Sequence, residues 1–283
     1  MKIAVTGANG LFGRGLVQVI GKDHLVVPMT RAAADLTDAG AVRNVLQAIA
    51  PDALIHTAGM PDPDLCERDP ELAFRANVLA TRNIVEVARE IGFPVAHIST
   101  DAVFDGSAST PRTESDPTRP ISVYGRSKLQ AEKEVLRLDR SWVFRVSVLF
   151  GPGKQNFVEK GLRLIESGAT YTVASDQVGT ATYTLDATRK ILEVIQSGRH
   201  GLFHLCNQGA CSRLELAQEA ARLTGLPTER IRGARIEAMN RPGPRPRYAV
   251  MEMQSLRDAG IAPPRNWRLA LADHLASEAG HRQ

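Results

Sequence analysis

The sequence predicts an α/β protein with a doubly wound parallel sheet of the Rossmann type and a smaller C-terminal domain. Three observations predict this fold. Short apolar strands alternate with helix-length segments, a glycine-rich turn follows the first strand, and the alternation changes after Gly151. Strands buried on both faces and separated by helices are typical of parallel sheets. We therefore expect a first domain over residues 1–151 and a second mainly over residues 152–283, with some of its segments returning to the first sheet.

The elements of the first domain follow from their apolar patterns. Strands are expected at Lys2–Thr6, Leu25–Met29, Ala53–His56, Val95–Ser99 and Trp142–Val148. Helical periodicity predicts helices at Leu11–Ile20, Val42–Ala50, Glu71–Ile91 and Val123–Leu138. Gly92 and Pro94 end the third of these helices. The crossovers between the strands should be right-handed.

The second half is less regular. Helices are expected at Phe157–Ser167, Leu185–Ser197 and Leu214–Leu223, and a strand at Leu202–Cys206. Residues 231–247 are rich in Pro and Arg, and Arg241 to Arg247 is the densest basic stretch. This stretch is either a solvated loop or a loop that meets a phosphorylated ligand. We expect the last few residues to fray.

Composition excludes several classes of protein. The 283 residues are 43% hydrophobic and 23% charged, as in ordinary globular enzymes. The net charge of +4 comes without a dense Lys/Arg run or an aromatic platform, which argues against a nucleic-acid partner. No secretory signal opens the chain and no apolar run approaches the ~20 residues of a membrane span, so we expect a cytoplasmic protein. The three cysteines (Cys66, Cys206, Cys211) are too few and too scattered for a disulfide framework or a metal site.

The glycine-rich turn predicts a dinucleotide site. Strand one runs directly into Thr6-Gly7-Ala8-Asn9-Gly10-Leu11-Phe12-Gly13. Glycine is required where such a turn is tight, where backbone approaches pyrophosphate and where the helix packs on the strand. The following helix aims free N–H groups and its positive dipole end at the phosphates. We therefore expect an NAD(P) site formed by Gly7, Asn9, Gly10, Leu11, Phe12 and Gly13.

The ends of strands two and three extend this site. Strand two ends in Arg31 rather than in an acid, and arginine can meet a 2′-phosphate, which favours NADPH with NADH as the alternative. The small residues Thr57, Ala58 and Gly59 after strand three let the cofactor pass close to the sheet. Asp38 is expected to cap the next helix, and His56 to be only a strand-end residue. Asn77 either reaches backbone near the site or faces solvent.

Tyr124 and Lys128 are the predicted catalytic pair. Residues four apart lie on one face of a helix. An unperturbed tyrosine titrates at about 10, and a nearby ammonium is expected to lower that value. Tyr124 could then exchange a proton with a carbonyl that accepts hydride from the nicotinamide, while Lys128 holds the ribose. Thr100, at the carboxyl end of strand four, would add a hydrogen bond to the substrate oxygen.

The chain resembles the dTDP-4-dehydrorhamnose reductase family of extended short-chain dehydrogenases/reductases over nearly its whole length. The resemblance is carried by Thr6 to Gly13, Asp35-Leu-Thr-Asp38, Asp64-Leu-Cys-Glu67, Ser99 to Gly106, Pro120 to Lys128, Arg145 to Gly151, Asn156-Phe-Val158, Asp176 to Thr182 and Arg245-Pro246. It implies an NAD(P)H-dependent reductase of a nucleotide-linked 4-keto-6-deoxy sugar. It also implies that Thr100, Tyr124 and Lys128 are catalytic and that Asp35 and Leu36 lie near the adenine. Asp101, Ala102, Asn156, Gln177 and Arg245 would lie around the sugar nucleotide, where arginine suits a diphosphate.

Three departures from the family pattern bear on the substrate. Ala102 stands where the family has an aromatic residue, Ala181 replaces a proline, and Tyr248 to Glu252 replaces the usual Asn-Ser-x-Leu-Asp. Because 4,6-dehydratases need an Asp-Glu pair after the Thr, Ala102 argues against dehydration. An epimerase and a non-catalytic NADP-binding regulatory subunit stay open as alternatives, as does a homodimer.

Overall fold

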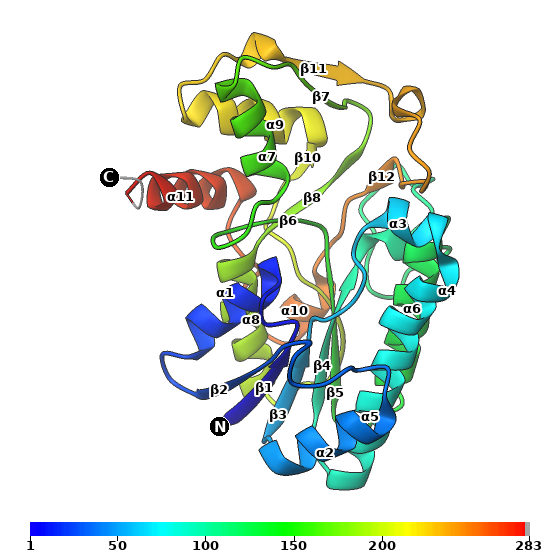
Figure 1. The fold of residues 1–283 in the computed structure, drawn as a ribbon. Helices are drawn as coiled ribbons and strands as arrows, with labels where there is room; N and C mark the ends of the chain where they lie inside the picture. The colour runs from blue at the N-terminus through cyan, green and yellow to red at the C-terminus, as the bar shows by residue number, and fades with distance from the viewer. Residues whose placement is uncertain (281–283) are drawn as a thin grey trace.

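The chain forms two stacked parts, one built on a large parallel sheet and one on smaller sheets and helices (Figure 1). The computed structural model describes residues 1–280. The fraying expected for the last few residues concerns a segment that lies largely outside this range. None of the helices within residues 1–280 combines the length and apolar character that a membrane crossing requires.

The large sheet confirms the predicted doubly wound fold. Its six parallel strands lie in the order β2-β1-β3-β4-β5-β9. They are β1 (Lys2–Thr6), β2 (Leu25–Met29), β3 (Ala53–His56), β4 (Val95–Thr100), β5 (Ser141–Val146) and β9 (Gly201–His204). The chain moves from β1 to β2 and then returns to the other side at β3. Ligands bind at such a reversal, beyond the carboxyl ends of the strands.

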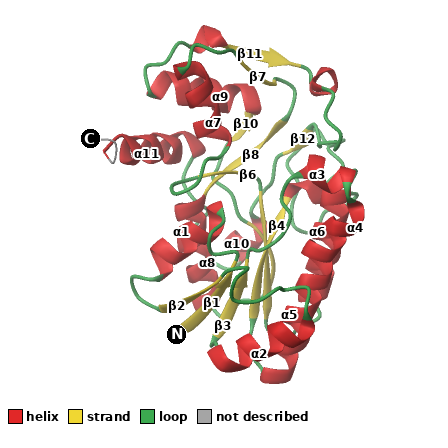
Figure 2. Ribbon diagram, viewed as in Figure 1, coloured by secondary structure: helices red, strands yellow, loops and turns green. Residues whose placement is uncertain are grey.

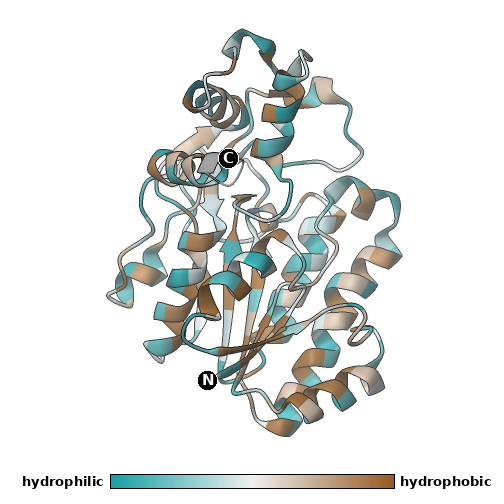
Figure 3. Cartoon of the chain, turned by 60° about the vertical axis from the view of Figure 1, so that its left-hand side comes forward, coloured by the Kyte–Doolittle hydropathy of each residue, from teal (hydrophilic) through white to brown (hydrophobic). Residues whose placement is uncertain are grey.

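Helices cover both faces of this sheet because its strands are apolar on both faces. α1 (Leu11–Ile20) and α8 (Thr184–Gln196) pack together on one side, and α2 (Ala39–Ile49), α5 (Ala80–Ile91) and α6 (Val123–Val135) lie on the other (Figures 1 and 2). Ile3 and Val5 join the core beneath α1 and α8, whereas Ala4 joins the core beneath α2 and α5. Figure 3 shows these strands as the hydrophobic centre of the domain.

The segment between β3 and β4 is more broken than the sequence suggests. The helix expected over Glu71–Ile91 is α4 (Pro70–Phe74), a π-helical turn η1 (Arg75–Leu79) and then α5. A short helix α3 (Pro63–Arg68), which the sequence analysis did not predict, precedes it. π turns inside helices are rare and frequently mark functional sites. This one carries Asn77.

The second part has its own sheet. Its strands β6 (Val148–Phe150), β8 (Val178–Tyr183), β10 (Ala210–Ser212) and β12 (Tyr248–Ala249) centre on β8, and β7 (Tyr171–Ala174) pairs with β11 (Ile231–Ala234). The helices α7 (Phe157–Glu166), α9 (Arg213–Leu223) and α11 (Trp267–Gly280) pack around them, while α10 (Gln254–Asp258) lies against β9. The short 3₁₀ turns are η2 (Asp101–Val103), η3 (Thr228–Arg230) and η4 (Ile236–Met239).

One predicted strand is divided between the two parts. The run expected over Trp142–Val148 leaves the large sheet at Ser147, whose N–H donates to Thr182 Oγ1 at 3.2 Å. From Val148 onward the chain pairs with β8. β9, although it comes from the second half, pairs with β5 in the large sheet. Ser147 therefore lies at the junction of the two sheets.

Candidate active site

The glycine turn after β1 has the geometry of a phosphate cradle. Gly7 has a φ of +66°, and a Cβ there would lie 2.7 Å from the Ala58 nitrogen. A Cβ on Gly13 would lie 2.2 Å from the Gly7 carbonyl oxygen, so the helix can approach the strand only without that side chain. Gly10 caps α1 without a side-chain hydrogen bond, and no acid stands in the first turn. The first N–H groups of α1 are therefore left for an anion such as pyrophosphate.

A buried polar network holds this turn against the end of β3. Thr6 Oγ1 lies 2.7 Å from His56 Nδ1, and His56 Nε2 lies 3.0 Å from Thr81 Oγ1, which itself donates to a carbonyl of η1. His56 thus carries its proton on Nε2 and accepts from Thr6. Burial lowers the pKa of His56 to about 3, which keeps it neutral. His56 is structural, as expected, and the Thr57 hydroxyl donates to the Thr6 carbonyl at 2.8 Å beside it.

Asn77 reaches backbone near the site rather than facing solvent. Its Oδ1 accepts the Met60 N–H at 2.7 Å, and its Nδ2 donates to the Met60 carbonyl at 3.2 Å and to Ser127 Oγ at 2.9 Å. A Cβ on Gly59 would lie 2.7 Å from Asn77 Oδ1. The π turn therefore fastens the Thr57-Ala58-Gly59 segment to the helix that carries Tyr124 and Lys128.

The residues expected near the adenosine lie beyond β2. Arg31 is exposed. The Asp35 carboxylate accepts the Thr37 N–H and hydroxyl, both at 2.9 Å, and these bonds lower the pKa of Asp35. The Leu36 carbonyl accepts from Asn83 Nδ2 at 2.9 Å. Asp38 caps α2, as predicted, by accepting the N–H groups of its first turn at 2.8 and 3.0 Å.

Tyr124 is placed by the start of α6. Ser122 caps this helix, and Glu67 Oε2 accepts the Val123 N–H at 3.0 Å. A Cβ on Gly125 would lie 2.2 Å from the Ala102 carbonyl oxygen, so α6 packs directly on the turn that follows β4. Tyr124 is half-buried there, beside the Thr100 hydroxyl.

The expected lowering of the Tyr124 pKa by Lys128 is not what the structure shows. Burial raises the pKa of Tyr124, and the nearby Asp101 raises it further, against the opposing effect of Thr100. Lys128 instead donates to the Ile98 carbonyl at 2.6 Å and to His97 Nε2 at 2.9 Å. Burial lowers the pKa of Lys128 to about 8, with Glu132 acting in the opposite direction. Lys128 is not among the groups that shift the pKa of Tyr124, and burial favours the protonated phenol.

Asp101 lies between the end of β4 and the second part of the chain. Its carboxylate accepts from Thr100 Oγ1 at 3.0 Å and from Ser147 Oγ at 2.6 Å. Burial raises its pKa, and the charge of Arg213 opposes this. Arg213 begins α9, and its Nη1 is buried without a hydrogen-bond partner among the described residues. Ala102, between Thr100 and the contact with Gly125, is buried.

Two residues expected around the substrate have local partners. Asn156 caps α7, with Oδ1 accepting the Val158 N–H at 3.0 Å and Nδ2 donating to the Gly151 carbonyl at 3.1 Å. Both polar atoms of the Asn156 side chain therefore form hydrogen bonds within the loop that joins the two parts. Gln177 is half-buried, and its backbone carbonyl oxygen accepts the backbone N–H of Arg213 at 3.1 Å. Gln177 therefore lies beside Arg213, a residue that sequence reasoning missed.

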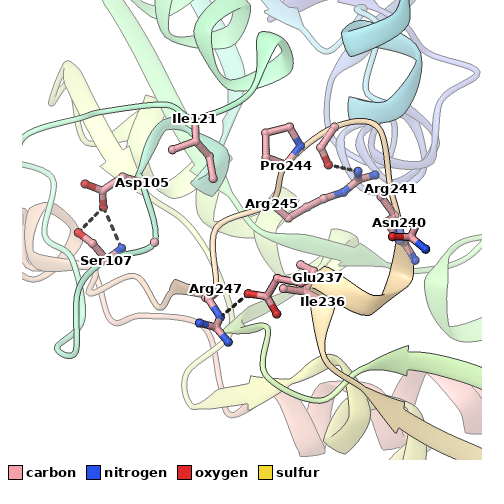
Figure 4. Close-up of a pocket in the computed structure, with 12 residues that line it drawn as sticks. Asp105, Ser107, Ile121, Ile236, Glu237, Asn240, Arg241, Pro244, Arg245 and Arg247 are labelled. Carbon is pink, nitrogen blue, oxygen red and sulfur yellow. Dashed lines mark hydrogen bonds and ion pairs between the residues drawn. The ribbon is translucent and has the colours of Figure 1, made fainter.

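Arg245 lies on a segment that is linked to α3 and lines a cavity. It forms an ion pair with Asp64, which also accepts the Gly243 N–H at 3.0 Å. The hydrogen bond from Arg245, and to a smaller extent the one from Gly243, lowers the pKa of Asp64. The segment borders a cavity of about 580 Å³, drawn in Figure 4. The cavity is lined by Asp105, Gly106, Ser107, Ile121, Ile236, Glu237, Asn240, Arg241, Gly243, Pro244, Arg245 and Arg247.

The lining of this cavity does not include Thr100 or Tyr124, but it lies close to both in the chain. Asp105 follows the η2 turn after Thr100, and Ile121 precedes the Ser122 cap of α6. Arg241 belongs to its wall, so the basic stretch meets a cavity rather than forming only a solvated loop. Within the described range, no group of three or more His, Cys, Asp or Glu side chains is placed to bind a metal.

Two signals in the sequence pointed to residues that we did not single out. His97 is a polar residue inside an otherwise apolar strand, and Ser147 interrupts another. Arg213 has no such signal, because its proximity to Asp101 arises only when β10 pairs with β8.

Comparisons with known proteins agree with this geometry. The family model described as RmlD substrate binding domain matches residues 1–279. A dTDP-4-dehydrorhamnose reductase of Mycolicibacterium smegmatis is 34% identical, over 99% of this chain and 86% of that protein. The crystal structure of a dTDP-4-dehydrorhamnose reductase from Clostridium acetobutylicum has a TM-score of 0.94 and 34% identity, over 99% of this chain and 100% of that chain. The Bacillus anthracis reductase, solved in complex with NADP, has a TM-score of 0.94 and 28% identity, covering 98% and 99%.

Proposed function

The chain belongs to the RmlD substrate binding domain family, and on this premise we propose that it reduces the keto group of a nucleotide-linked 4-keto-6-deoxy sugar. Its homologues are NAD(P)-dependent oxidoreductases. The observation that supports the proposal most strongly is that Tyr124 lies beside Thr100 at the carboxyl end of β4, on the same edge of the parallel sheet as the glycine turn after β1. A dTDP-linked sugar is the substrate that the relatives favour.

Tyr124, Thr100 and Lys128 have separate roles in the proposed reduction. The nicotinamide, when bound, supplies hydride to the carbonyl carbon. Tyr124 holds a proton at its phenol oxygen because burial raises its pKa, and it donates that proton to the developing alkoxide. Thr100 supplies a hydrogen bond to the same oxygen once its hydroxyl, which donates to Asp101 in this structure, turns toward the substrate. Lys128 holds the ribose with the N–H that its two protein acceptors leave free.

NADPH is the proposed cofactor. Arg31 is exposed at the end of β2, where a guanidinium can reach a ribose 2′-phosphate. The NADP complex of the B. anthracis relative supports the same choice.

Two features of the site support a distinct substrate preference. Ala102 stands where the family has an aromatic side chain, and the charge of Arg213 acts on the buried Asp101. We propose that Asp101 and Arg213 bind oxygen atoms of the sugar from opposite sides. Dehydration is not favoured, because it would need an acid at Ala102.

The test is a direct assay. Purified protein is mixed with NADPH and dTDP-4-dehydrorhamnose, and the nicotinamide absorbance is followed, with Tyr124→Phe as the control. We expect NADPH oxidation by the native chain and a loss of roughly 10²- to 10⁴-fold in the variant. No oxidation with this substrate or with other 4-keto sugar nucleotides would overturn the proposal. Sugar conversion without net NADPH consumption would favour an epimerase, and NADPH binding without turnover would favour a regulatory subunit.

A further inference from the structure

The Lys128 ammonium is held by two acceptors from β4. Of its three N–H groups, one donates to the Ile98 carbonyl oxygen at 2.6 Å and one to His97 Nε2 at 2.9 Å. The third N–H has no protein acceptor within the described residues. The backbone acceptor is available whatever residue occupies the strand. The second acceptor exists only because residue 97 is histidine.

His97 can accept this bond only as a neutral imidazole with its proton on Nδ1. The ring is buried at 1% exposure, and burial together with the charge of Lys128 holds its pKa well below the usual range. Its Nδ1 has no hydrogen-bond partner within the described part of the chain. A buried N–H without an acceptor is unfavourable, and an apolar side chain in this strand would avoid it.

The surroundings argue against a proton relay through His97. The His56 ring lies 5.1 Å away, centroid to centroid and tilted by 35°, and both His56 nitrogens are engaged by threonines. The charged group that faces Lys128 from its own helix is Glu132, one turn further on, which is itself paired with Arg145. The hydrogen-bonded path from Lys128 therefore ends at His97.

We propose that His97 is a positioning residue for Lys128, which holds the ammonium in its charged form with one N–H free for the cofactor ribose. The part of this inference that concerns turnover rests on the proposed function. The part that concerns cofactor binding does not, and the experiment separates the two.

The matched variants are His97→Gln and His97→Asn. A glutamine amide reaches the position of Nε2 and can accept from Lys128, whereas an asparagine amide reaches only the position of Nδ1. The affinity for NADPH is measured by the fluorescence of the bound nucleotide from pH 6 to 10, and thermal melting reports folding. The turnover assay with dTDP-4-dehydrorhamnose is run on the same samples.

For the native chain, we expect binding to weaken as Lys128 loses its proton, above about pH 8. His97→Asn removes an acceptor of the ammonium, so this loss should begin at lower pH, with affinity reduced about tenfold or more at neutral pH. His97→Gln keeps an acceptor for the ammonium, so its affinity for NADPH and its pH profile should stay close to those of the native chain.

Other results would overturn the inference. If the two variants bind NADPH with equal affinity and the native pH profile, and differ from the native chain only in melting temperature, His97 serves packing alone. If the native chain binds NADPH with the expected profile but turns over no 4-keto sugar, the proposed function fails while the role of His97 stands.

Discussion

Arg145 and Glu132 form a two-point ion pair in the interior of the first domain, with Nε–Oε1 at 2.9 Å and Nη2–Oε2 at 2.8 Å. Both side chains are at most 4% exposed. The Ser99 hydroxyl donates to Glu132 Oε1 at 2.5 Å. Glu132 lies on α6, Arg145 on β5 and Ser99 on β4. The pair therefore fixes the helix of Tyr124 and Lys128 relative to the strand that ends at Thr100.

Breaking this pair should strongly destabilise the fold. Glu132→Gln keeps the shape of the side chain but leaves the Arg145 guanidinium buried without its counter-charge. Removing one partner of a buried ion pair lowers the free energy of unfolding by about 3–5 kcal/mol. Urea denaturation followed by circular dichroism measures this change.

The matched control is Glu90→Gln. Glu90 pairs with Arg43 at 2.6 Å, but the two side chains are 50% and 43% exposed. Solvent screening limits such a pair to about 1 kcal/mol or less. Equal losses of stability in the two variants would show that burial does not determine the contribution of Glu132.

Arg31→Ala should change cofactor preference. If Arg31 meets the 2′-phosphate, its removal raises the Kd for NADPH about tenfold or more and leaves the Kd for NADH nearly unchanged. Arg89→Ala, which removes an exposed arginine paired with Glu86 on α5, is the charge-matched control. Equal weakening of both nucleotides by Arg31→Ala would contradict the proposed preference for NADPH.

Asp64→Asn should loosen the segment of Gly243 and Arg245 that lines the cavity. The neutral amide cannot form the ion pair with Arg245, so the segment loses its charged link to α3. We expect KM for the nucleotide sugar to rise about tenfold with kcat nearly unchanged, because binding rather than chemistry is affected. Asp62→Asn, which preserves the N-cap of α3, should leave both constants near the native values. A fall in kcat at constant KM would assign Asp64 a different role.

Ser147→Ala should move the acidic limb of the activity profile. Burial raises the pKa of Asp101, and the Ser147 hydrogen bond is one of the contacts that lower it. Without that bond the pKa rises further. If ionised Asp101 binds the substrate, kcat/KM should then begin to fall at a higher pH as the solution is acidified. An acidic limb at the native pH would show that Asp101 does not control it.

The elements of the first domain could be predicted because their signals are local. The observed bounds of β1, α1, β2 and β3 equal those read from the sequence, since apolar runs are interrupted there by glycine, proline and polar residues. β8 and β10 were missed because small and polar residues such as Gly179, Thr180 and Ser212 lack a strand pattern. They become strands only by pairing with each other and with β6.

The site divides in the same way. The glycine turn and the spacing of Tyr124 and Lys128 are properties of short segments, and the structure places both where the sequence predicts. The partners of these residues could not be predicted. His97 precedes Lys128 by 31 residues, and Arg145 follows Glu132 by 13.

The sequence by itself determined the doubly wound sheet, the glycine turn after β1 and the spacing of Tyr124 and Lys128 on one helix, because each depends on local periodicity and on residue type. The tertiary structure decided their chemical state. It placed Lys128 against His97 and desolvated Tyr124, so that the pKa of the tyrosine rises instead of falling. The physical reason is that desolvation and charge–charge interactions depend on the three-dimensional surroundings of a group, which the spacing of residues along the chain does not contain.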